Sequence, residues 1–157
     1  MNSVANGQPV VPRSGYIVEI NTLWYNALCF ANDLLNSNGE IESLNSSKPI
    51  IEKLNNSFVE TFLNEHGYLL DYVDGEVVDW SVRPNMIFAA AFDYSPLNSK
   101  QKKRVLDIVT KELLTPRGLR TLSPMSLGYN PNYVGTQYER DYAYHQGTAW
   151  PWLAGFY

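Results

Sequence analysis

The sequence predicts an all-α fold in which inner helices line a toroid and outer helices pack against them. Four segments carry apolar residues at helical spacing, and in chain order they alternate between mostly apolar and amphipathic. The connections between them are long, whereas a plain four-helix bundle, the alternative fold, prefers short loops. The 157 residues, 45% of them hydrophobic, suffice for one domain but are few for two.

The first predicted helix covers residues 16 to about 35, after an irregular lead-in of fifteen residues that contains Pro9, Pro12 and Gly15. Its apolar residues recur at helical spacing. They are Ile17, Ile20, Leu23, Trp24, Ala27, Leu28, Ala31 and Leu34. Because Tyr25, Cys29 and Phe30 lie between them, the helix is apolar around most of its circumference, and we expect neighbours on more than one side.

The second predicted helix begins after Ser46 and Ser47, which can cap it, and places Pro49 in its first turn. Gly67 marks its end, and its amphipathic pattern indicates a surface position. Residues 68–82 follow, with the turn dipeptide Asp74-Gly75. This stretch predicts either a short hairpin or an extended loop.

The third and fourth predicted helices repeat the alternation. The third covers residues 84–92, and its run 86–92 has no polar side chain, so it must be enclosed. The fourth covers residues 99–114 and separates an apolar face from a charged face, as a surface helix does. Residues 115–148 show no regular pattern, and long segments of this kind are usually functional.

Composition excludes several classes of function. The net charge of −4 and the absence of a dense basic segment make nucleic acid an unlikely partner, and no segment suits a membrane. The start of the chain has neither a basic nor an apolar leader, so we expect a cytoplasmic protein. The single Cys29 predicts no internal disulfide, and His145 lacks a second nearby His or Cys for zinc. No phosphate-binding glycine loop or nucleophile elbow is present.

Aromatic residues gather near the end of the chain, from Tyr129 onward, among Asn, Gln, His and Gly. This mixture suits a site that stacks on a polar ring and forms hydrogen bonds to it. The segment 140–152 concentrates the pattern, with Asp141, His145 and Gln146 beside two tryptophans. The alternatives are that the histidine is structural and that the tryptophans belong to the core.

Five arginines lie in the predicted connections, where a guanidinium can fix a carboxylate or orient a ligand, or simply staple two loops together. They are Arg13, Arg83, Arg117, Arg120 and Arg140. Glycoside cleavage would require a pair of carboxyl groups. The candidates away from the charged helix faces are Glu19, Asp71, Asp79, Glu139 and Asp141, and sequence spacing does not pair them.

Four stretches resemble, in order, motifs of the glycogen debranching enzyme family, in its amylo-α-1,6-glucosidase domain. They are PRSGYIVEINTLWYNAL (12–28), SVRPNMIFA (81–89), LLTPRGLRTLSP (113–124) and RDYAYHQGTAWPW (140–152). The resemblance implies that residues 1–157 form one partial domain, a portion of a twelve-helix (α/α)₆ barrel of the six-hairpin glycosidase type. It also implies inverting hydrolysis, without a cofactor, of an α-1,6-linked glucose at a glycogen branch stub.

The resemblance places Asn2 where the family carries its general acid and expects the base beyond Tyr157, so we expect this chain alone to be inactive. An α-glucan oligosaccharide is the expected ligand. The residues expected near the sugar are Glu19, Trp24, Arg83, Asn85, Asp141, Tyr144, His145, Gln146, Trp150 and Trp152. We also expect self-association through exposed inner-helix surface such as residues 86–92. The competing hypothesis is a non-catalytic carbohydrate-binding or structural helical module.

Overall fold

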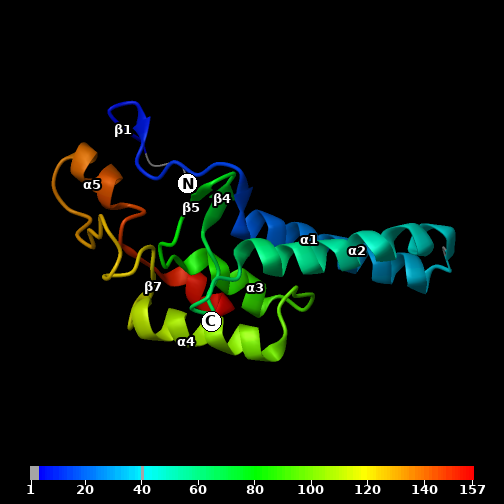
Figure 1. Cartoon of the computed structure of the whole chain (residues 1–157). Helices are drawn as coiled ribbons and strands as arrows, with labels where there is room; N and C mark the ends of the chain where they lie inside the picture. Colours follow the sequence, from blue (N-terminus) through cyan, green and yellow to red (C-terminus); the bar gives the residue numbers. More distant parts are fainter. Residues whose placement is uncertain (1–3, 40) are drawn as a thin grey trace.

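The structure, a computed structural model, describes residues 4–39 and 41–157 and has a mixed α/β architecture (Figure 1). The prediction of an all-α barrel portion is wrong, because the described residues form three small antiparallel sheets beside the helices. Backbone N–H and C=O groups in the long connections need partners, and they find them in ladders of two or three residues. Strands this short carry no alternating pattern that a sequence could display.

The two longest helices, α1 (Val18–Ser37) and α2 (Ile41–Phe62), lie side by side and project away from the remaining elements (Figure 1). The first agrees with the predicted helix. The second begins before the predicted start, so that Pro49 lies inside the helix rather than in its first turn. Polar contacts join the pair, among them the Ser47 hydroxyl donating to Asn32 Oδ1 at 2.7 Å.

One face of α1 is exposed, although the sequence predicted neighbours on more than one side of this helix. Val18, Thr22 and Cys29 are its buried residues. The large apolar side chains on the opposite face remain at least 46% exposed; they are Ile20, Leu23, Trp24, Phe30 and Leu34. The described residues therefore cover α1 on the side that faces α2 and α3.

A three-stranded sheet lies at the base of the helical pair, formed by β3 (Tyr16–Ile17), β4 (Tyr72–Asp74) and β5 (Val77–Val78). The turn between β4 and β5 contains Gly75 at φ 58°. Of the two possibilities for residues 68–82, the hairpin is the one formed. A separate two-stranded ladder joins β1 (Val4–Ala5) to β2 (Gln8–Pro9).

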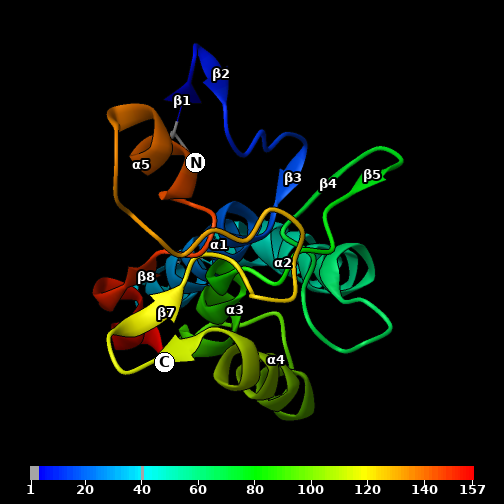
Figure 2. The ribbon, with the colours of Figure 1, turned by 90° about the vertical axis from the view of Figure 1, so that its left-hand side faces the viewer.

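The C-terminal half contains regular structure where none was predicted. Strands β6 (Leu114–Thr115), β7 (Gly118–Arg120) and β8 (Ala149–Trp150) form an antiparallel sheet. The short helix α5 (Gln137–Ala143) begins with a capping box between Thr136 and Glu139. Figure 2 shows β7 and β8 side by side, with the chain of residues 121–148 leaving this sheet and returning to it.

The core lies between the middle helices and the β7 sheet. The predicted third helix is a 3₁₀ turn, η1 (Pro84–Met86), followed by α3 (Ile87–Ala91), and the fourth is α4 (Ser99–Glu112). The chain ends in the 3₁₀ helix η2 (Pro151–Phe156), which packs on β7 and α3. Fully buried side chains come from all of these elements, including Ile87, Val105, Val109, Leu119 and Leu153.

Enclosure of the third predicted segment is confirmed for Met86, Ile87 and Ala89, which are buried within the chain itself. They are therefore not free to form the self-association surface expected at residues 86–92. In the part of the chain that the structure describes, no helix is both long enough and apolar enough to cross a membrane.

Candidate functional site

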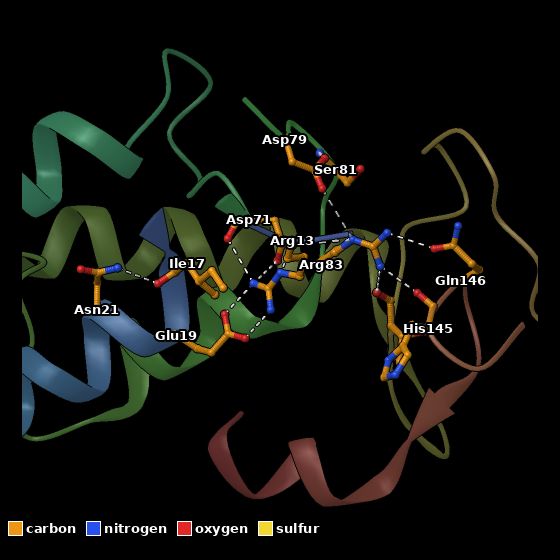
Figure 3. A network of polar contacts seen from close by, with 11 residues as sticks. Arg13, Ile17, Glu19, Asn21, Asp71, Asp79, Ser81, Arg83, His145 and Gln146 are labelled. Carbon is orange, nitrogen blue, oxygen red and sulfur yellow. Dashed lines mark hydrogen bonds and ion pairs between the residues drawn. The ribbon is translucent and has the colours of Figure 1, made fainter. Parts of the chain in front are cut away.

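A buried carboxylate, Asp71, lies between two arginines, Arg13 and Arg83 (Figure 3). Asp71 is 2% exposed. Arg13 approaches it closely, with Nε 2.7 Å from Oδ2 and Nη2 3.0 Å from Oδ1. Arg83 lies on the other side, with Nε 3.9 Å from Oδ2. The two positive charges compensate for burying the carboxylate.

Local structure explains how these residues meet. Asp71 directly precedes β4, and its carbonyl accepts a hydrogen bond from the Val18 amide at the start of α1. Glu19 lies in the first turn of α1, where the helix dipole favours an anion. Its carboxylate receives both Nη groups of Arg13, at 2.5 and 2.6 Å. The paired strands β3 and β4 thus bring the lead-in segment and the helix start to Asp71.

Arg83, just before η1, joins this ionic cluster to the C-terminal segment. Its Nη1 donates to the His145 carbonyl at 2.7 Å and to the Thr121 carbonyl at 3.3 Å. Its Nη2 donates to Gln146 Oε1 at 3.0 Å. Asp79 Oδ2, 3.9 Å from Arg83 Nε, supplies a second nearby negative charge. The planar guanidinium therefore contacts three separate segments of the chain, at residues 71–79, at Thr121 and at residues 145–146. Figure 3 shows it pointing toward His145 and Gln146.

Burial shifts the pKa values of two side chains at this site, Asp71 and His145. Burial raises the pKa of Asp71 to about 6, although Arg13 and Arg83 act in the opposite direction. Burial, assisted by the charge of Arg83, lowers the pKa of His145 to about 4. The His145 imidazole is thus neutral at physiological pH. Its Nδ1 is buried and has no hydrogen-bond partner among the described residues.

Next to this cluster, four rings form what we call the aromatic wall: Tyr144, His145, Trp150 and Trp152. The centroid of His145 lies 4.8 Å from that of Tyr144 and 4.9 Å from that of Trp150. Trp150 and Trp152 are 6.1 Å apart. Tyr144 is 43% exposed and Trp152 55% exposed. The wall therefore presents ring surface to solvent above a buried, neutral imidazole.

Two glycines permit close approaches between the segments that carry the aromatic wall and their neighbours. Gly118 in β7 has φ 122°, and a Cβ there would lie 2.3 Å from the carbonyl oxygen of Trp150. Gly147 has φ 143°, and a Cβ there would lie 2.6 Å from the ring of Tyr129. Both positions combine a backbone conformation that favours glycine with a close approach of another segment.

The structure brings together six of the ten residues that the sequence placed near a sugar. They are Arg83, Tyr144, His145, Gln146, Trp150 and Trp152. Glu19 connects to them through Arg13 and Asp71. Trp24 projects from the exposed face of α1, and Asn85 is half-buried in η1.

The remaining carboxylate, Asp141, lies in α5, where it accepts a hydrogen bond from Gln137 at 2.7 Å. Asn2, expected at the general-acid position, lies outside the described residues. Arg13 and Asp71 were recognised by sequence as a loop arginine and a candidate carboxylate, but not as partners, because 58 positions separate them. Among the described residues, no three or more His, Cys, Asp and Glu side chains come together as a group that could hold a metal ion.

Two comparisons with known proteins indicate the same family. The family model described as amylo-alpha-1,6-glucosidase matches residues 1–157. The glycogen debranching enzyme of Saccharomyces cerevisiae is 27% identical to this chain over 188 residues. That alignment covers 96% of this chain and 12% of the yeast protein, so the chain spans about an eighth of the relative's length.

Proposed function

The chain belongs to the amylo-alpha-1,6-glucosidase family, and on this premise we propose that it contributes a glucan-binding wall to a glycogen debranching glucosidase. Residues 1–157 form one partial domain of that enzyme. The parent reaction is inverting hydrolysis of an α-1,6-linked glucose at a branch stub, and it uses no cofactor.

The observation that carries this proposal is the partly exposed aromatic wall beside buried polar side chains. Tyr144 and Trp152 offer ring faces on which the C–H groups of a glucose ring can pack. The tyrosine hydroxyl and indole N–H groups can reach sugar hydroxyls at the edges of the wall. The further proposed contacts are Glu19, Trp24, Asn85, Asp141, His145, Gln146 and Trp150. Arg83, which the sequence also placed near the sugar, is buried, and we propose that it acts through His145 and Gln146.

We propose that this chain alone binds glucan without cleaving it. Inverting hydrolysis requires a protonated acid and a base that flank the scissile bond. In the described part of the chain, Asp71 and Asp79 both lie against Arg83, which draws them into the buried ionic cluster. Asn2, at the position that the resemblance assigns to the acid, has an amide that cannot supply a titratable proton.

We also propose that the chain self-associates. The surface we propose is the exposed face of α1 rather than residues 86–92. The exposed apolar side chains of α1 are arranged almost symmetrically about Ala27, with Trp24 and Phe30 on either side and Ile20 and Leu34 at the ends. In an antiparallel pair of copies crossing at Ala27, each large side chain would meet an apolar partner. The small Ala27 would permit close approach of the two helices.

Isothermal titration with maltose and with isomaltose tests sugar binding. We expect saturable heat with the unaltered chain and its loss in Trp152→Ala, whose ring is 55% exposed and also packs on Phe88 and Phe156. The thermal midpoint of each variant shows whether it is folded in the titration. Trp80→Ala is the matched control, because Trp80 is also about half exposed but packs near His66, away from the wall. Trp150 is less suitable, since it packs on the core. Absence of heat with the unaltered chain would favour a structural module.

A further inference from the structure

We propose that Arg83 is a positioning residue: it holds the turn at His145 and Gln146 and thereby sets the aromatic wall, without contacting the sugar itself. The inference rests on the proposed function of the wall, which it deepens. Arg83 is 4% exposed, so sugar on the solvent side of the wall would not reach its guanidinium.

The hydrogen bonds of Arg83 lie where they can orient two rings. The His145 carbonyl that accepts from Nη1 belongs to the same residue whose ring packs against both Tyr144 and Trp150. Gln146, the next residue, is held through its side chain at 3.0 Å. Because both neighbours are held, the backbone keeps one direction through this turn. The rings of Tyr144 and His145 before it and of Trp150 and Trp152 after it are then oriented together.

Other bonds to this turn come from different parts of the molecule. The Gly147 amide donates to the Thr121 hydroxyl at 2.9 Å, and the Asn130 amide donates to the Gln146 carbonyl at 2.6 Å. These bonds tie the turn to the segment that leaves β7. Arg83 instead ties it to η1 and, through Asp71, to the start of β4. It therefore sets the wall relative to the sheet and to α1.

The chemistry of the site calls for arginine rather than lysine. Asp71 and Asp79 both lie nearest to Nε, at 3.9 Å, and balance the buried charge. The two Nη groups are then available for the carbonyls of Thr121 and His145 and for the Gln146 side chain. A lysine ammonium would preserve the charge, but as a compact group on a flexible stem it could not span these acceptors at once.

Fluorine NMR of the chain labelled with 5-fluorotryptophan tests the inference without any ligand. The chain has four tryptophans, so four resonances can be assigned by single Trp→Phe substitutions. In Arg83→Lys we expect the signals of Trp150 and Trp152 to move and those of Trp24 and Trp80 to stay. Arg13→Lys is the matched control, since that side chain is also buried against Asp71 but does not bond to the turn.

Maltose titration of the same two variants supplies the second measurement. We expect affinity to fall about tenfold in Arg83→Lys, and much less in Arg13→Lys. Unmoved Trp150 and Trp152 signals in Arg83→Lys would overturn the inference. A loss of affinity without movement of these signals would also overturn it, because Arg83 would then contact the sugar directly.

The positioning role of Arg83 can still be tested in two other cases. If the unaltered chain binds no maltose, the proposed function fails, while the fluorine signals still test positioning by Arg83. If Arg83→Lys does not fold, Gln146→Met removes a single acceptor of the guanidinium with little change of volume. That variant should move the same two signals by a smaller amount, and unmoved signals would refute positioning through this contact.

Discussion

Asp71 and His145 both lie in the interior, and their ionisation affects folding in opposite directions. Burial raises the pKa of Asp71 from 3.8 to about 6, so its native form binds a proton more readily than its unfolded form does. Stability from this group therefore rises as pH falls through 6 toward 4. Burial lowers the pKa of His145 from 6.5 to about 4, so stability from this group falls across a similar range.

Single substitutions should separate these two contributions. Relative to the unaltered chain, we expect the thermal midpoint of His145→Gln to rise more, or fall less, as pH is lowered from 7 to 4. Asp71→Asn should show the opposite change, in addition to a loss of stability at all pH values because Arg13 and Arg83 lose their shared carboxylate. Calorimetric unfolding at several pH values measures this, and parallel pH profiles for all three chains would contradict it.

At the scale of secondary-structure elements, the contact between β7 and β8 depends on Gly118. We expect Gly118→Ala to lower the unfolding free energy by at least roughly 1–3 kcal/mol, because φ 122° strains an alanine and its Cβ would collide with the Trp150 carbonyl. Gly155→Ala is the control, since a Cβ there meets nothing within 4 Å. Urea unfolding measures the free energy of unfolding of both variants. Equal values for Gly118→Ala and Gly155→Ala would contradict the prediction.

Helices could be predicted from this sequence far better than strands. The periodic pattern located α1 and α4 closely, and the enclosed run at residues 86–92 became α3 with its preceding 3₁₀ turn. Each strand has two or three residues and is stabilised by partners distant in sequence, as when Leu119 pairs with Trp150. Periodicity within a segment carries no information about such pairing, so the all-α prediction failed at the connections.

At the candidate site too, contacts within one short segment could be predicted and contacts between distant segments could not. The clustering of Tyr144, His145, Trp150 and Trp152 could be predicted because these residues lie within one short segment. The ionic cluster could not, because Arg13, Asp71 and Arg83 come from three segments that only the fold brings together. From the sequence, Arg13 and Arg83 could be named as loop arginines and Asp71 as a candidate carboxylate, but not as partners of one another.

At the scale of the whole molecule, we expect the purified chain to release no glucose from limit dextrin. Hydrolysis would need an acid and a base on either side of the bond, and the carboxylates of Asp71 and Asp79 lie against Arg83. An enzymatic glucose assay measures release against a buffer blank. Release that persists after repurification would contradict the prediction, and Asp141→Asn would then test whether that carboxylate acts as a substitute.

The exposed face of α1 predicts the behaviour of the isolated chain in solution. Burying Phe30, Leu34 and their neighbours between two copies would remove a continuous apolar stripe from water, so we expect light scattering to give a mass that rises with concentration. Introducing charge in Phe30→Glu/Leu34→Glu should restore a monomer, because an antiparallel crossing would then place the glutamates against apolar side chains of the other copy. Leu127→Glu is the control: Leu127 is fully exposed but lies outside α1, so this change should leave association intact. A constant monomer mass of the unaltered chain across dilution, or equal dissociation by the control, would refute association through α1.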